Sequence, residues 1–174
     1  MSDFDYSVLE AQQSIHELIA QQHPLEQTLD AIASWVASMM PGALVFIMRF
    51  HPNSNTLRLI PNDQFSDRFC QAMQNIPVDE NAGTCGTAAC TKHPVITDDI
   101  QKDRRWNGYR DTADAEGIRA CWSVPILTSG NELLGTFAVY YRVAASPTAG
   151  AQRNLARGAA LVALAILRHR DFQD

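Results

Sequence analysis

Two segments of this chain have the residue types of β-strands but carry apolar side chains on both faces. Residues 43–50, ALVFIMRF, and residues 132–142, ELLGTFAVYYR, are rich in the β-branched and aromatic residues that favour strands. Successive side chains of a strand point to opposite faces, so a strand that is apolar on both must be covered on both. The sheet that holds these strands therefore needs a layer of protein on either side.

Helices near the two ends of the chain are predicted to cover one face. Residues 7–10, SVLE, have the spacing of a capping box and open a helix that ends at His23-Pro24. A second helix begins at Leu25 and stops at Pro41-Gly42, and a closing helix is expected over about 147–170. Each has apolar residues at helical spacing, so we expect these helices on one side of the sheet.

Residues 63–117 remain to cover the other face. We expect, in chain order, a helix over 63–76, a short helix over 87–91 preceded by Gly83 and Gly86, a strand over 94–97, and a helix over 109–116 closed by Gly117. Residues 43–50 and 56–60 are expected to form one hairpin, and residues 119–127 and 132–142 a second one. This order of helices and strands predicts an α+β fold with an antiparallel sheet. A sheet roofed by loops and short helices favours a small-molecule cavity.

The strand predicted over 119–127 gives such a cavity a small and polar floor. Its Trp122 and Val124 fall on one face, whereas Cys121 and Ser123 fall on the other. From strand face and loop position, the expected ligand-lining residues are Phe46, Met48, Trp106, Tyr109, Cys121, Ser123, Thr136 and Tyr140. For Trp106 and Tyr109 two interpretations stay open, the aromatic wall of a pocket or plugs that fill it.

Length, composition and charge limit the number of domains, the partners and the localisation that can be expected. The chain has 174 residues, 46% of them hydrophobic and 19% charged, which fits one globular domain over residues 1–174. Its net charge of −5 offers no basic field for nucleic acid or an anionic membrane. The acidic N-terminus has no signal-peptide pattern, and the longest apolar run, 158–167, is about half of the roughly 20 residues a membrane span needs. We expect a cytoplasmic protein with reduced cysteines.

Five motifs in a fixed order give the chain a family resemblance. They are 83–89, GTCGTAA; 99–100, DI; Asp103 with Trp106; 117–126, GIRACWSVPI; and 134–138, LGTFA. As an ordered set they resemble the GAF domain, in the sensor variety found in bacterial histidine kinases and cyclic-di-GMP turnover proteins. The resemblance spans about residues 25–167 and leaves 1–24 as a helix for dimerisation or signalling.

The resemblance carries expectations of its own. It implies a sheet of five or six antiparallel strands, dimerisation through the terminal helices, and control of an output domain such as a histidine kinase or a diguanylate cyclase or phosphodiesterase, which this chain does not contain. It names no ligand or cofactor. None of the four cysteines precedes a histidine, so covalent bilin is not supported, and the cyclic-nucleotide motif of the family has no counterpart here.

The cysteines allow a catalytic alternative. Free methionine-R-sulfoxide reductases share the motif that contains Cys85, although Cys90 and Cys121 lie at other positions than the remaining cysteines of that branch. Cys85, Cys90, Cys121 and His93 are also conceivable zinc ligands, but free cysteines more often behave as small buried hydrophobes. The acidic residues at 98, 99 and 103 fit turns and caps without a metal. We expect neither a metal nor a catalytic site.

The closing helix bears on assembly. Residues 159–167 are apolar on almost all sides of the predicted helix. Either a homodimeric helix bundle or deeper packing within one subunit would bury these sides. The preferred hypothesis is a non-catalytic, homodimeric regulatory domain that binds an unidentified small molecule. The alternatives are a thiol-dependent reductase and a dimerisation module without a ligand.

Overall fold

The computed structural model describes residues 2–171, and its centre is an antiparallel sheet in the order β3-β2-β1-β6-β5-β4. The strands are β1 (Leu44–His51), β2 (Thr56–Leu59), β3 (Ile76–Pro77), β4 (Val95–Thr97), β5 (Ala120–Leu127) and β6 (Leu133–Tyr141). Both predicted hairpins are present, β1 with β2 and β5 with β6. The two strands with apolar faces on both sides, β1 and β6, are neighbours at the middle of the sheet.

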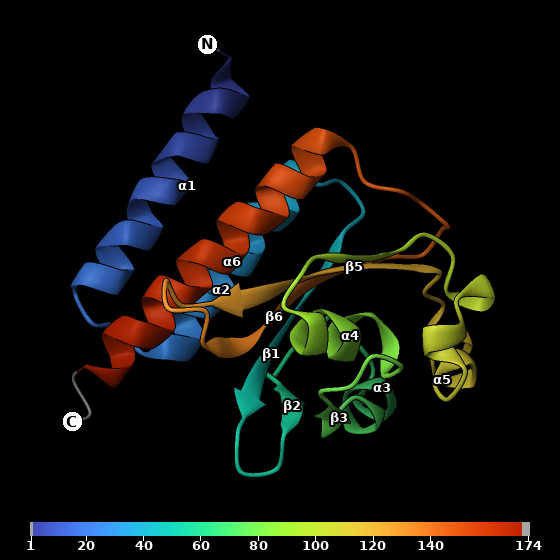
Figure 1. Ribbon diagram of the computed structural model, residues 1–174. Coiled ribbons are helices and arrows are strands. Elements are labelled where there is room, and N and C mark those ends of the chain that lie inside the picture. The colour runs from blue at the N-terminus through green and yellow to red at the C-terminus, as the bar shows by residue number, and fades with distance from the viewer. Residues whose placement is uncertain (1, 172–174) are drawn as a thin grey trace.

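Three long helices lie on one side of the sheet (Figure 1): α1 (Asp3–Ala20), α2 (Leu25–Met39) and α6 (Ala149–Arg170). α2 and α6 pack on the strands, and α1 packs on α2 and α6 as an outer helix. The indole N–H of Trp35 donates to the backbone oxygen of Val8 at 3.1 Å and ties α1 to α2. The prediction of terminal helices on one face is confirmed, with α1 one layer further out.

Short elements cover the opposite face: α3 (Asp67–Ala72), α4 (Gly83–Thr91), the 3-10 helices η1 (Ile100–Lys102) and η2 (Arg104–Trp106), and α5 (Arg110–Glu116) (Figure 1). We call these elements and their connections the roof. The sheet therefore separates two hydrophobic cores, one under the long helices and one under the roof. This is the predicted α+β arrangement.

The starts of α1 and α4 differ from the prediction. The capping box that opens α1 uses Ser2, whose hydroxyl accepts from the backbone N–H of Asp5, whose carboxylate in turn accepts from the Ser2 N–H. The sequence 7–10 has the same spacing but lies inside the helix. α4 begins at Gly83 and includes Gly86. A Cβ at Gly86 would lie 2.6 Å from the Pro77 backbone oxygen, so this position needs a glycine. That glycine allows close packing rather than a turn.

The helix predicted over 63–76 is reduced to α3, and β3 was not predicted. The Asn62 side chain accepts from the Gln64 N–H at 2.8 Å and forms a turn there. Ser66 then caps α3 by accepting from the Phe69 N–H at 3.2 Å, so the helix cannot start earlier. Among residues 2–171, every helix falls short of the length or the apolar content that a bilayer-spanning helix requires.

Candidate functional site

The residues predicted to line a cavity meet under the roof. Phe46, Met48, Trp106, Cys121 and Tyr140 belong to the roof-side core and are almost fully buried. Ser123 and Thr136 are buried on the same face of β5 and β6. Tyr109 is partly buried and packs at the margin of this core.

Strand register explains how residues far apart in sequence meet on this floor. Cys121 of β5 lies opposite Tyr140 of β6, and Thr136 of β6 lies opposite Met48 of β1. Side chains opposite one another on one face of an antiparallel pair are in contact range. The floor therefore combines aromatic and aliphatic residues with a thiol and three hydroxyls.

Aromatic rings fill the space between this floor and the roof. Phe46 packs edge-on to Phe65 at 5.2 Å, to Phe69 at 5.9 Å and to Tyr140 at 5.2 Å between ring centroids. Trp106 lies 6.2 Å from Tyr140 and is 1% exposed, so it is a plug rather than an open wall. Phe65 and Phe69 were not among the predicted site residues. Their spacing of four residues puts both on one side of the helix that was predicted over 63–76.

A chain of hydrogen bonds holds Trp106 in place. The Thr97 hydroxyl donates its one proton to the Asp103 carboxylate at 2.8 Å, so the Thr84 hydroxyl must donate to Thr97, also at 2.8 Å. Thr84 is then free to accept from the indole N–H of Trp106 at 2.9 Å. Arg105 pairs with Asp103 at 2.6 Å and closes the chain at the surface. We call this chain the roof latch; its Thr84 was not among the predicted site residues.

Charge stabilises the outer end of the latch. Burial raises the pKa of Asp103, but the hydrogen bonds from Arg105 and Thr97 outweigh burial, so the pKa lies below its ordinary value. Asp99 also has a lowered pKa, chiefly because Arg119 binds it at 3.0 Å. Both carboxylates cap 3-10 helices, as the sequence predicted for turn and cap residues. Among residues 2–171, no three metal-ligating side chains gather in one place.

Cys85 is the centre of the polar part of the site. It lies in the first turn of α4, 2% exposed, and belongs to the same roof-side core as Cys121 and Tyr140. The hydrogen bond with Cys121 lowers the pKa of Cys85 most, burial opposes it, and the hydroxyls lower it further. Burial raises the pKa of both Cys121 and Tyr140 well above their ordinary values.

Three hydroxyls of this cluster are left without a well-formed bond. The oxygens of Ser123, Thr136 and Tyr140 are buried and have no hydrogen-bond partner of good geometry among the described residues, although they lie close enough to Cys85 to affect its pKa. A buried polar group without a partner costs about 1–3 kcal/mol. The floor therefore carries polar groups that the fold itself does not use.

The other cysteines are placed differently. Cys90 is exposed and Cys70 is half-buried, with its thiol 3.7 Å from the Asn62 backbone oxygen. Cys85 and Cys90 differ in environment even though both lie on α4. All four cysteines are free thiols.

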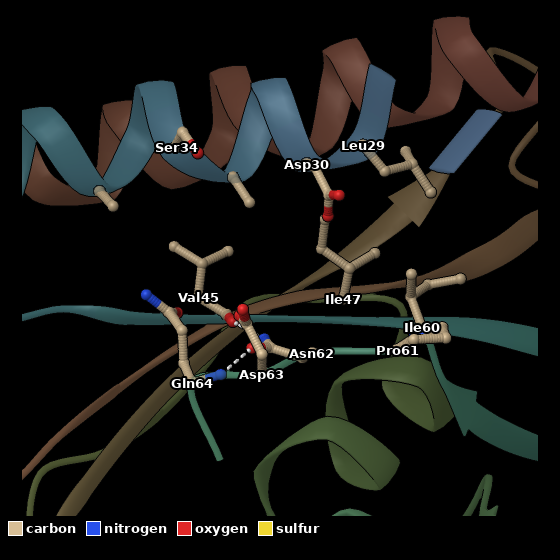
Figure 2. Close-up of a pocket in the computed structure, with 12 residues that line it drawn as sticks. Leu29, Asp30, Ser34, Val45, Ile47, Ile60, Pro61, Asn62, Asp63 and Gln64 are labelled. Carbon is tan, nitrogen blue, oxygen red and sulfur yellow. Dashed lines mark hydrogen bonds between the residues drawn. The ribbon is translucent and has the colours of Figure 1, made fainter. Parts of the chain in front are cut away.

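A groove of about 680 Å³ lies on the opposite face of the sheet, between α2 and residues 60–64 (Figure 2). Val45 and Ile47 form its apolar floor, and Asp30 and Asp63 face it from the two sides. The Asn62 amide is already bound to the Val45 oxygen at 2.7 Å. None of the predicted site residues lines this groove, and its carboxylates are exposed, so the roof-side cluster is the stronger candidate.

Comparisons with known proteins agree with this architecture. The family model described as the GAF domain matches residues 22–167. A methyl sulfide methyltransferase-associated sensor from Methanosarcina acetivorans is 32% identical over 137 residues, which cover 79% of this chain and 14% of that protein.

Two solved structures have the same fold. The GAF domain of a phosphoenolpyruvate-protein phosphotransferase from Coxiella burnetii superimposes with a TM-score of 0.78 at 15% identity, covering 99% of both chains. Free methionine-R-sulfoxide reductase from Neisseria meningitidis, solved with its substrate, gives a TM-score of 0.73 at 18% identity, covering 99% of this chain and 95% of that one. With its family match, its sheet and its roof, the chain belongs to the GAF-domain family.

Proposed function

We propose that this GAF domain is a non-catalytic regulatory module that binds a small molecule between the sheet and the roof. The observation that carries the proposal is the group of three buried hydroxyls, on Ser123, Thr136 and Tyr140, that lack a good partner among the described residues. The great majority of buried polar groups in native proteins have a hydrogen-bond partner, so three neighbouring groups without one point to a functional role. A ligand with polar atoms would complete their hydrogen bonds.

The construction of the roof supports entry of such a ligand. Aromatic side chains occupy the space over the floor, so a ligand has to displace part of the roof. The roof consists of short elements and connections joined to the sheet by the latch, and segments of this kind open at lower free energy than long packed helices. A ligand that binds the displaced arrangement better would shift the population toward it.

The long helices are the proposed route to an output domain. α6 packs on α2, β5 and β6, so a displaced sheet changes the surface that α6 rests on. The similarity to a sensor of Methanosarcina acetivorans supports a role in signal transduction. Because this chain matches 14% of that protein, the identity of the output domain is itself part of the proposal.

We also propose that the domain dimerises through α1 and α6. Ala159, Val162 and Ala163 are buried within one subunit, so packing inside the chain accounts for most of the apolar surface of α6. The terminal helices nevertheless expose Tyr6, Leu9 and Leu164, at 54%, 50% and 46%. Large apolar side chains exposed on helices are typical of helix-mediated association.

A thermal-shift screen of the reduced protein tests the binding proposal. We expect at least one compound of a small-metabolite library to raise the melting temperature of the wild type. The variant Ser123→Ala/Thr136→Val/Tyr140→Phe keeps the apolar shape of the floor without its hydroxyls, and the same compound should not stabilise it. Compounds that stabilise both proteins equally, or none that stabilises the wild type, would contradict the proposed site.

An activity assay separates this proposal from the reductase alternative. The wild type and the variants Cys85→Ser and Cys121→Ser are each incubated with free methionine-R-sulfoxide and a dithiol reductant. A regulatory domain shows no turnover above the buffer rate in any of the three. Turnover by the wild type that either substitution abolishes would establish the reductase instead.

A further inference from the structure

The groove of about 680 Å³ on the helix side of the sheet is open because the third long helix does not cover it. α2 and α6 pack on the strands, whereas α1 packs on α2 and α6 further out (Figure 1). All helical residues that line the groove belong to α2. Residues 60–64, which follow β2, form the wall opposite α2 (Figure 2).

Hydrogen bonds hold this wall in place. The Ile60 N–H donates to the Ile47 oxygen at 3.0 Å. The Asn62 amide donates to the Val45 oxygen at 2.7 Å, and its side-chain oxygen accepts from the Gln64 N–H at 2.8 Å. The wall is thus tied to β1 before any ligand arrives, so a ligand does not have to order it on binding.

Small side chains on α2 leave room above an apolar floor. Val45 and Ile47 of β1 form the floor, and Ala33 and Ala37 line the groove from α2. Twelve residues line the groove, fewer than the roughly 20–30 that each side of a protein–protein interface contributes. Its volume lies within the roughly 300–1,000 Å³ of small-molecule sites. The shape therefore fits a small molecule rather than a partner chain.

The groove carries negative charge on both sides. Asp30 on α2 and Asp63 on the wall face it (Figure 2). No Lys, Arg or His of residues 2–171 lines it. Neither carboxylate has a hydrogen bond or an ion pair with another described residue. Hydrogen bonds between an ammonium group and a carboxylate are among the stronger ones, so the groove offers acceptors that a cation would use.

We propose that this groove is a second ligand site and that its ligand is a small organic cation, an ammonium group attached to an apolar body. The apolar body lies on Val45 and Ile47, and the ammonium group donates to Asp30 or Asp63. The proposal goes beyond the function proposed above, because the groove shares no residue with the roof-side cluster and lies on the other face of the sheet.

The ligands that line the groove suit an ammonium group better than a metal ion. Ca²⁺ takes six to eight oxygen ligands and Mg²⁺ takes six in a strict geometry. Val45 and Ile47 direct apolar side chains into the groove where such an ion would need oxygen atoms. An ammonium group has three N–H donors, and one or two carboxylates with solvent satisfy them.

Occupancy of the groove bears on the long helices. α2 lines the groove and packs on α6, the helix proposed above as the route to an output domain. A ligand that fits one position of α2 better than another would shift the population of that position. This consequence rests on the proposed function, whereas the site itself does not.

NMR titration at low ionic strength and pH 7 tests the site with three probes of one shape. They are the cation 4-phenylbutylamine, the neutral 4-phenylbutan-1-ol and the anion 4-phenylbutyrate. The amine should saturably shift backbone amide signals of α2 and of residues 60–64. It should bind about 3–10-fold tighter than the alcohol, because exposed ion pairs contribute modestly, and the anion should bind most weakly. An amine that binds no tighter than the alcohol, or that shifts signals of the roof alone, would overturn the proposal.

Variants locate the recognition. Asp30→Asn/Asp63→Asn should reduce the affinity for the amine to that for the alcohol. Glu80→Gln/Asp111→Asn removes the same charge at exposed positions outside the groove and should bind the amine like the wild type. Equal loss in both double variants would show that net charge alone attracts the amine, and would overturn the assignment.

Two further variants separate this site from the roof-side one. Ala33→Phe fills the groove and should weaken binding of the amine and of the alcohol alike. Ser123→Ala/Thr136→Val/Tyr140→Phe should bind the amine like the wild type, so a failure of the roof-side proposal leaves this result unchanged. Loss of amine binding in that triple variant, with full binding in Ala33→Phe, would place the cation under the roof and overturn the proposal.

Discussion

At the scale of single residues, the site contrasts polar groups that are satisfied with polar groups that are not. Thr97 is 1% exposed and takes part in two hydrogen bonds, with Thr84 and with Asp103. Thr136 is 0% exposed and its hydroxyl has no good partner among residues 2–171. The first residue stabilises the fold, and the second costs stability that binding would recover.

Thr136→Val should therefore raise the free energy of unfolding, by about 1 kcal/mol, because it removes an unpartnered buried hydroxyl and keeps the shape. Thr97→Val is the matched control and should lower the free energy of unfolding by about 1–3 kcal/mol, because it leaves Thr84 and Asp103 without a partner. Urea unfolding measures both. Destabilisation by Thr136→Val would show that its hydroxyl is already satisfied.

The roof latch should respond to acid through Asp103. Its pKa in the folded protein lies below the unfolded value of about 3.9, so the stabilisation is complete above about pH 4 and is lost as the pH falls through the folded pKa. At pH 7, Asp103→Asn should lower the free energy of unfolding by about 1–2 kcal/mol, because it removes the carboxylate that pairs with Arg105. Solvent screens this ion pair only in part, since Arg105 is only partly exposed. Urea unfolding from pH 7 to pH 3 should show this difference shrinking below pH 4. A difference that stays constant with pH would refute the role of the carboxylate.

At the scale of elements, hydrophobic pattern and stop signals predicted most of the fold. The second helix, the β1–β2 hairpin and α5 with its Gly117 cap appear as expected, because each is defined by local spacing and a strong terminator. The predicted starts of α1 and α4 were wrong for different reasons. Ser2 caps α1 although Ser7 has the same capping spacing, and Gly86 lies inside α4 because it contacts β3, which sequence spacing does not encode.

The candidate site was likewise predicted where local pattern decides and missed where tertiary packing decides. Strand alternation placed Cys121, Ser123, Thr136 and Tyr140 on one face, since side chains alternate strictly along a strand. It did not predict that Cys85 from α4 would share a core with Cys121 and Tyr140, because helix-to-sheet docking depends on tertiary packing. Nor did it predict the Thr84–Trp106 bond, which joins residues 22 apart through the roof.

Packing of α6 on the sheet should depend on Gly158. A Cβ there would lie 2.8 Å from Phe137 Cζ and 3.0 Å from Val36 Cγ2. Gly158→Ala should lower the free energy of unfolding by about 1–3 kcal/mol through overpacking. Gly150→Ala lies in the same helix, with its nearest neighbours at 3.7 Å or more, and should be neutral or slightly stabilising. Thermal denaturation compares the two, and equal effects would contradict this account of helix docking.

At the scale of the whole molecule, the sheet separates the layer of long helices, where we propose association, from the roof, where we propose ligand binding. The proposal of a homodimer places the interface on the exposed apolar side chains of α1 and α6. Analytical ultracentrifugation should show a dimer for the wild type and a monomer for Leu164→Arg. Val143→Arg, at a 65% exposed position outside these helices, should remain dimeric. A monomeric wild type would refute the interface.

The central claim is that the floor keeps its buried hydroxyls in order to hold a small molecule. Native mass spectrometry of the protein purified from its natural source tests this claim most directly. The account predicts an additional noncovalent mass that unfolding releases and that the Ser123→Ala/Thr136→Val/Tyr140→Phe variant, purified in the same way, does not carry. The bare mass of the polypeptide for the wild type, or the same bound mass on both proteins, would contradict it.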